Sequence, residues 1–229
     1  MVVLIVAVVV IGYGRVVTGH LARGSVSHSQ SQGLADWTAL NGRCPAHPAT
    51  PLSRPKYQTP ALSIQPGLTY IATVATTVGT FRIELDPTVA PFSVNSFVFL
   101  ADVGYFNCNI FQRVVPGSID LTGNPVGTGL SFPGYITKVE RPPLAAEPDD
   151  QYPIGSVALA NSGLYDAGGS EWFVVAGAQG ASLPNDYSLI GHVISGLNVV
   201  DQINEEGSIS GAPIVTQRVL TVQVVSERG

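Results

Sequence analysis

Residues 111–129 read FQRVVPGSIDLTGNPVGTG, and this stretch carries the strongest functional signal in the 229-residue chain. Its apolar beginning holds a single cation, Arg113, and the Pro116-Gly117 pair after it predicts a turn into a glycine-rich loop. A cation is costly to bury without a partner. We therefore expect Arg113 to face a cleft, and the alternative is a structural salt bridge.

From residue 70 onward the sequence predicts many short strands, two helices and turns rich in Gly and Pro. Apolar and polar residues alternate on both sides of Val78-Gly79, which predicts a hairpin. Asn198 is a candidate cap for the second helix. The expected strands are 70–76, 80–85, 110–116, 118–122, 154–160, 171–176, 188–194 and 214–225, and the expected helices are 91–103 and 197–204. This pattern is typical of a closed antiparallel barrel.

Four blocks of the chain resemble the cyclophilin family of peptidyl-prolyl isomerases, in the same order. Residues 111–129 resemble the family's Phe-His-Arg-Val-Ile-Pro-Gly-Phe element and the Gln-Gly-Gly-Asp element after it. The other three blocks are 78–106, 159–175 and 183–203. The resemblance covers roughly residues 70–225 and implies a mainly β fold, a closed eight-stranded antiparallel barrel capped by two helices. An extended N-terminal tail precedes it.

The chemistry that the resemblance implies needs no nucleophile, metal or cofactor. An X-Pro bond isomerises over a barrier of about 18–20 kcal/mol, because the twisted amide loses its resonance. Catalysis needs a pocket for the proline ring and a donor that stabilises the twisted amide. A guanidinium is always charged and presents its donors in a rigid fork, which suits this role. The resemblance assigns it to Arg113.

The resemblance also implies a set of residues that contact the substrate. Phe173, Ile119 and Leu183 match the apolar wall of the proline pocket, and Ala160 and Asn161 match the positions whose backbone contacts the peptide. Tyr187 stands where many members carry His, and a phenol can still line a pocket and donate a hydrogen bond.

Three substrate-contacting positions depart from the family pattern. Ser118 replaces the Phe of the pocket floor, Leu121 replaces the substrate-binding Gln, and Glu171 replaces the Gln of the Ser-Gln-Phe block. Losing an aromatic wall removes about 1–3 kcal/mol of binding free energy from apolar burial. Losing an amide removes about 1 kcal/mol of hydrogen bonding. Together these changes predict an activity lower by about two to three orders of magnitude.

The chain before the domain divides into two parts. Residues 1–17 contain ten consecutive apolar residues and predict a membrane anchor or signal-like segment, with a buried strand or helix as the alternative. Residues 18–69 are first Gly/Ser-rich and then Pro-rich, which predicts a linker and a tail. The domain is expected over 70–229. A membrane-anchored or exported protein on the extracytoplasmic side is favoured, but Arg15 and Arg23 after the apolar run favour the cytoplasmic alternative.

Two cysteines, Cys44 in the tail and Cys108 in the domain, leave two possibilities open. A disulfide between them would fasten the tail to the domain in an oxidising compartment. Two free thiols fit the spacing equally well.

The composition narrows the classes of partner. Eleven Lys and Arg against 16 Asp and Glu give a net charge of −5, so no basic face for nucleic acid is expected. His192 is the single histidine after residue 47, and we expect it to be an ordinary strand residue. Two hypotheses remain: an isomerase, weakened at several positions, that acts on X-Pro-containing polypeptides, or a catalytically degenerate binding or structural subunit of a membrane-associated complex.

Overall fold

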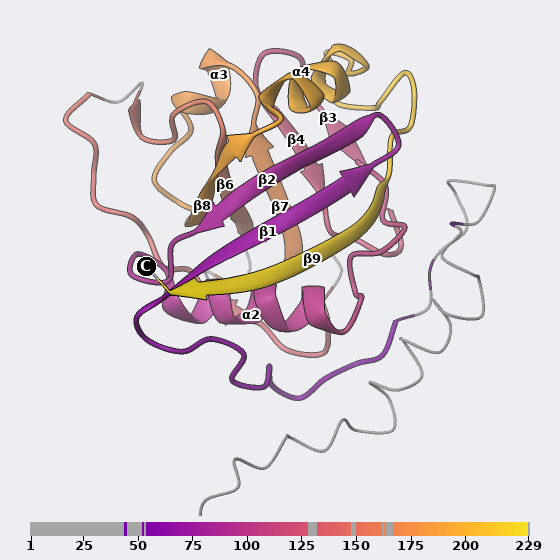
Figure 1. Ribbon diagram of the computed structural model, residues 1–229. Helices are drawn as coiled ribbons and strands as arrows, with labels where there is room; N and C mark the ends of the chain where they lie inside the picture. Colours follow the sequence, from indigo (N-terminus) through magenta and orange to yellow (C-terminus); the bar gives the residue numbers. More distant parts are fainter. Residues whose placement is uncertain are drawn as a thin grey trace, which may run out of the picture.

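The computed structural model describes residues 44, 52, 54–127, 132–147, 150–161, 163 and 167–228. It contains an antiparallel β-sheet rolled into a barrel, with helices at the two ends (Figure 1). The strands are β1 Leu68–Thr76, β2 Gly79–Leu85, β3 Arg113–Val114, β4 Ile119–Thr122, β5 Thr137–Lys138, β6 Ser156–Asn161, β7 Ala167–Val175, β8 Ser188–Ser195 and β9 Val219–Arg228. The helices are α2 Pro91–Asp102, α3 Ala178–Ala181 and α4 Leu197–Glu205.

Eight strands follow one another around the barrel in the order β3-β4-β7-β6-β8-β2-β1-β9, and β5 adds to β7 outside this path. Every pairing is antiparallel. The two ends of the order are linked by an isolated bridge between Ile110 and Arg218 and not by a ladder between β3 and β9, so among the described residues the sheet is not fully closed as the sequence predicted. The predicted mainly β architecture with a helix over each open end is confirmed.

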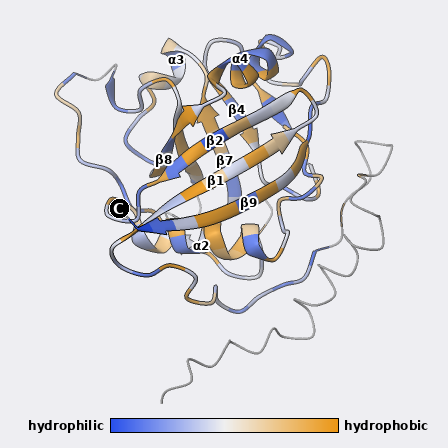
Figure 2. Cartoon of the chain, viewed as in Figure 1, coloured by the Kyte–Doolittle hydropathy of each residue, from blue (hydrophilic) through white to orange (hydrophobic). Residues whose placement is uncertain are grey.

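Alternation of side chains builds the interior. In β1 and β2 the inward residues Ala72, Val74, Phe81 and Ile83 are fully buried, and apolar residues concentrate on the strands and on α2 (Figure 2). At one end of the barrel Trp172 meets the ring of Phe97 from α2 edge-to-face, with 5.6 Å between ring centroids. The core therefore joins the sheet to its helical cap.

The two predicted helices form, but their starts have different causes. α2 begins with Pro91 at its first turn, and the carboxylate of Glu140 accepts the backbone N–H groups of Phe92 (3.2 Å) and Ser93 (2.7 Å). The predicted cap of α4 at Asn198 is wrong. Gly196, with φ of 81°, takes the cap position two residues earlier, so the helix already begins at Leu197.

Two strands are shorter than predicted, and one helix was not predicted. The strand expected over 110–116 pairs regularly only at Arg113–Val114, because Val115 already closes the turn by donating to the carbonyl of Ile119 (2.9 Å). The strand expected over 214–225 begins at Val219. The four-residue helix α3 carries no apolar period from which it could have been found.

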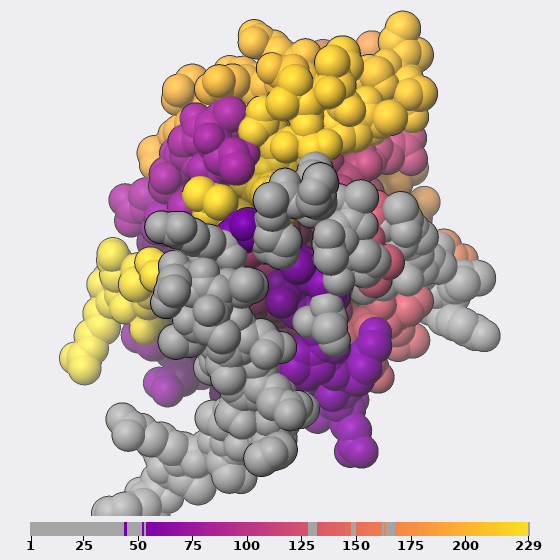
Figure 3. Space-filling view, turned by 90° about the vertical axis from the view of Figure 1, so that its right-hand side faces the viewer, coloured from indigo at the N-terminus to yellow at the C-terminus, as the bar shows by residue number. Residues whose placement is uncertain are grey.

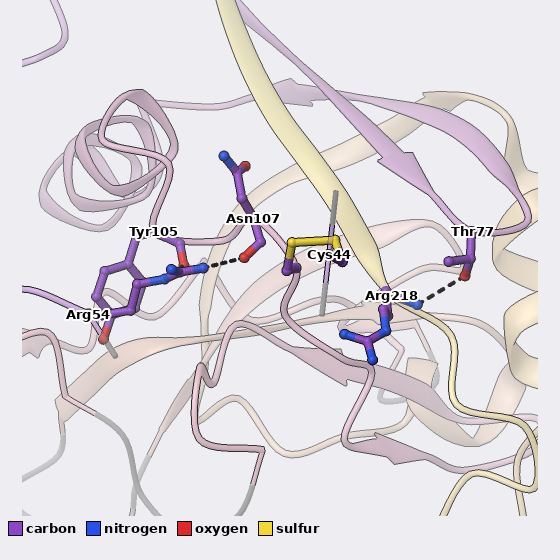
Figure 4. The surroundings of a disulfide bond; sticks show 7 residues. Cys44, Arg54, Thr77, Tyr105, Asn107 and Arg218 are labelled. Atoms are coloured by element: carbon purple, nitrogen blue, oxygen red, sulfur yellow. Dashed lines mark hydrogen bonds between the residues drawn. A yellow bond between two sulfur atoms is a disulfide. The ribbon is translucent and has the colours of Figure 1, made fainter. Parts of the chain in front are cut away.

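The described part of the tail lies against the domain. The structure joins Cys44 to Cys108 in a disulfide, and the Arg54 guanidinium donates to the carbonyls of Tyr105 (3.0 Å) and Asn107 (Figure 4). Tyr57 is buried and packs edge-to-face on Phe99, at 5.0 Å between centroids. Figure 3 shows the indigo residues of this segment seated on the domain surface. The tail is therefore part of the packed structure from residue 54 onward.

Replacing Cys44 by Ser removes a cross-link that spans 64 residues. We expect the free energy of unfolding to fall by about 2–4 kcal/mol, because the unfolded chain regains the freedom of a long loop. Urea denaturation of the oxidised protein measures the change, and reduced wild type should match the variant. Equal urea midpoints for oxidised and reduced wild type would contradict the prediction.

The apolar segment predicted as an anchor and the Gly/Ser-rich linker lie outside the described residues. In the part of the chain that the structure describes, no helix has the length and apolar character needed to cross a membrane.

Candidate active site

A row of cross-strand partners crosses the barrel wall and brings the predicted site residues together. Arg113 of β3 pairs with Leu121 of β4, Leu121 pairs with Phe173 of β7, and Phe173 pairs with Ala158 of β6. Directly opposed residues point to the same side of a sheet. Because Trp172, next to Phe173, belongs to the interior core, this row faces the outside of the barrel.

An apolar cluster surrounds Phe173 on this outer face. The ring of Tyr187 meets Phe173 edge-to-face, with 5.1 Å between centroids and an interplanar angle of 88°. Phe173 itself is only 1% exposed, so it forms the floor of the cluster. The partly buried members around it are Ile119, Leu121, Ala160, Leu183, Tyr187 and Leu189. Five of the residues predicted from the sequence to contact substrate thus pack against the cluster that contains the sixth, Phe173.

Tyr152 fixes one wall of this cluster. Its hydroxyl donates to the carbonyl of Tyr187 (3.0 Å) and accepts the N–H of the same residue (3.1 Å). Burial raises the pKa of Tyr152 to about 12, so the phenol stays protonated and keeps donating at neutral pH. Sequence reasoning missed Tyr152, because nothing near it in the chain indicates a contact 35 residues away.

Arg113 is exposed and forms no ion pair with any described residue, so the salt-bridge alternative finds no support there. Its stem lies along Gly211: a Cβ on that glycine would sit 3.0 Å from Cγ and 3.1 Å from Nε of Arg113. The same loop pairs with β3, since Val114 donates to the carbonyl of Gly211 (2.9 Å). Gly211, with φ of 84°, thus leaves room for the Arg113 side chain, and sequence reasoning missed it.

The remaining predicted residues lie at the margins of the cluster. Asn161, at the end of β6, donates from Nδ2 to the carbonyl of Asp186 (3.2 Å). Glu171 accepts a hydrogen bond from Asn124 (2.8 Å), so its carboxylate is tied to the loop after β4. Ser118 follows the turn after β3 and is partly exposed, and it adds no apolar wall.

A buried polar network lies beneath the turn between β3 and β4. Asn204 of α4 donates from Nδ2 to Asp120 (2.7 Å) and to the carbonyl of Val115 (3.0 Å), and its Oδ1 accepts the N–H of Gly117 (2.7 Å). Asp120 is fully buried, and its Oδ2 has no partner among the described residues. Burial, the largest cause, and the charge of Asp201 raise the pKa of Asp120 to about 7, against the effect of the Asn204 hydrogen bond.

The described residues include no group of three or more His, Cys, Asp or Glu side chains placed to hold a metal ion. The site instead offers an apolar surface, a guanidinium at its edge and ordered backbone at its margin.

Comparison with known proteins assigns the family. A family profile described as cyclophilin type peptidyl-prolyl cis-trans isomerase/CLD matches residues 71–225. The chain is 34% identical to a peptidyl-prolyl cis-trans isomerase of Helicobacter pylori over 60% of this chain and 82% of that protein. It is 37% identical to peptidyl-prolyl cis-trans isomerase B of Bacillus subtilis over 50% of this chain and 76% of that protein.

The fold is also found among solved structures. A cyclophilin type peptidyl-prolyl cis-trans isomerase of Cryptosporidium parvum superposes with a TM-score of 0.60 at 22% identity, over 69% of this chain and 99% of that one. The same protein crystallised in the presence of the dipeptide Ala-Pro gives a TM-score of 0.59 at 23% identity. With the profile match over more than half of its length, the chain belongs to the cyclophilin-type peptidyl-prolyl cis-trans isomerase family.

Proposed function

We propose that this domain catalyses the cis–trans isomerisation of X-Pro bonds in polypeptides, with Arg113 as the catalytic residue. The observation that carries the proposal is the outward-facing row of Arg113, Leu121 and Phe173 across three neighbouring strands. A guanidinium that forms no ion pair with any described residue thus lies on the same face as an apolar surface. Family membership and the names of its relatives support the same activity.

The proline ring would rest on the cluster floored by Phe173, with Ile119 and Leu183 at its sides. The Arg113 guanidinium would then donate to the amide as rotation breaks its resonance, which is a transition-state interaction and raises kcat. The backbone of Ala160 and Asn161, at the end of β6, would hold the peptide chain. No bond is made or broken, so the residues of this chain suffice for the reaction.

The direct test is an NMR exchange measurement on a short Ala-Pro peptide. We expect the wild-type protein to speed cis–trans exchange, at a rate lowered by the altered pocket. A protein that is folded but leaves exchange at its uncatalysed rate would refute the isomerase proposal. It would leave the binding or structural module, the less favoured hypothesis, as the function of this surface.

The double replacement Ser118→Phe with Leu121→Gln is expected to raise kcat/KM by about tenfold or more, for roughly 1–3 kcal/mol of regained binding. Ser118 is partly exposed after the turn, so a phenyl ring can extend over the site, and an amide at position 121 would lie beside Arg113. The control is Ser226→Phe, at an exposed position of β9. An unchanged kcat/KM in a folded double variant would contradict this account of the weakened pocket.

We infer from the apolar residues 1–17 that the protein is membrane-anchored or exported, and the alternative location is the cytoplasm. A membrane-associated complex is then a candidate partner. The full-length chain should then sediment with membranes and require detergent, whereas a chain that begins at Ala35 should remain in the supernatant. Thiol labelling of Cys44 and Cys108 in intact cells reports the compartment, because a cytoplasm would keep both reduced. Full-length protein recovered without detergent would refute the anchor.

A further inference from the structure

A second concave surface lies on the barrel away from the Phe173 cluster. It is a groove of about 840 Å³, within the range of about 300–1,000 Å³ that holds drug-sized ligands. Its walls come from tail residues 62–69, the end of β2, the loop into α2, and His192 of β8. Leu62, which lines it, is 85% exposed, so the groove offers apolar surface that the described residues leave uncovered.

The polar groups of the groove share one sign of charge. Glu84 and Asp86 line it together with His192, and no Lys or Arg does. Two cations lie at its margin without lining it: Arg82 is two residues before Glu84 on the same face of β2, and Arg228 pairs with Leu68. The groove therefore combines apolar walls with two carboxylates and attracts a cation.

These carboxylates retain acceptor capacity. Glu84 is partly buried beside His192, its cross-strand partner, and accepts no hydrogen bond from any described residue. Asp86 uses Oδ1 to accept the N–H of Thr88 (2.9 Å), whereas its Oδ2 is unused among the described residues. An ammonium or guanidinium group would supply donors to Glu84 and to Oδ2 of Asp86.

Strand β8 connects the groove to the candidate active site. Leu189 of β8 packs against the Phe173 cluster, and His192, three residues along the same strand, lines the groove. Three residues of a strand span only about 10 Å. A polypeptide held at the first surface can therefore reach the second with a short stretch of chain.

We propose that this groove binds a second segment of the client polypeptide, apolar with a lysine or arginine in it, separate from the X-Pro bond. The proposal rests on the proposed isomerase function for the identity of the client. The groove itself supplies the chemistry: apolar side chains lie against Leu62, Ile64 and Leu68, and the cation lies between Glu84 and Asp86. Binding of such a segment lengthens the residence time of the client on the protein, and therefore lowers KM without changing kcat.

The first experiment titrates the full chain with the proline-free peptide acetyl-Leu-Lys-Leu-Lys-Leu-amide, followed by amide shifts in NMR. We expect saturable binding that shifts Thr69, Leu85 and His192 and weakens with salt. Glu84→Gln and Leu62→Ser should each weaken it by about fivefold. The matched controls, Glu205→Gln on α4 and Ile209→Ser at a fully exposed position, should leave it unchanged.

The second experiment joins the same basic segment, or Leu-Glu-Leu-Glu-Leu, to an Ala-Pro peptide through a Gly-Ser linker. We expect a KM about fivefold lower for the basic peptide at equal kcat, and Glu84→Gln should abolish the difference. The proposal is overturned if the basic and acidic peptides have equal KM values or bind equally well. It is also overturned if the mass of the protein doubles on titration, because a second copy of the chain would then occupy the groove. If the folded wild type does not speed exchange of a short Ala-Pro peptide, the isomerase function is refuted instead. The titration with the proline-free peptide then decides by itself whether the groove binds a basic apolar segment.

Discussion

Replacing Arg113 by Ala lowers kcat/KM for an X-Pro peptide by an expected 100- to 1,000-fold, roughly the effect of removing one preorganised donor from a developing charge. Arg113 is exposed and pairs with no acidic residue among those described. Its removal should therefore change the free energy of unfolding by less than about 0.5 kcal/mol. The loss would lie in catalysis, because the apolar cluster proposed to hold the proline ring does not include this side chain.

Two further variants make this result specific. Arg113→Lys keeps the charge but loses the planar fork, so we expect it to recover only part of the activity. Arg82→Ala removes an exposed arginine from β2, away from the row of site residues, and should behave as wild type. NMR exchange and urea denaturation are measured on all three. Wild-type exchange in folded Arg113→Ala would remove Arg113 from the mechanism.

The parts of the fold that sequence predicted best are those built from local periodicity. Strand β2, with Phe81, Ile83 and Leu85 inward, and helix α2 follow periods of 2 and 3.6 that are visible without any partner. The matched family blocks then placed Phe173 and Arg113 in one site. Their spatial proximity depends on register across β3, β4 and β7, which the resemblance supplied and periodicity could not.

What the sequence did not predict depends on contacts between distant residues. Asn204 reaches Asp120 across 84 positions, and Gly211 makes room for Arg113 from a loop with no pattern of its own. The groove beside β8 exists only because tail residues fold back onto β2. A lone Asp in the apolar run IDLT was the one local signal for the buried network, and its partner could not be read from the chain.

Asp120 makes the stability of this protein depend on pH in a defined direction. Its pKa of about 7 in the folded state compares with about 3.9 in an unfolded chain. Between these values the folded state keeps a proton that the unfolded state releases, so the free energy of unfolding falls as pH rises from 4 to 7. The contribution is complete below pH 4 and gone above pH 7, and its upper bound is about 4 kcal/mol.

Asp120→Asn should remove this dependence and stabilise the protein at high pH. An amide has the shape of the protonated acid, and its Oδ1 can still accept from Asn204. We expect the variant to exceed wild type by about 2–4 kcal/mol at pH 8 and to match it within about 1 kcal/mol at pH 4. Urea denaturation at pH 4, 6 and 8 measures both, and Asp201→Asn, on the exposed side of α4, should show a much smaller change. If Asp120→Asn is less stable than wild type at pH 8, the prediction is wrong and the network stabilises the ionised carboxylate. Asn204 would then stabilise the turn beside Arg113 through a charged partner.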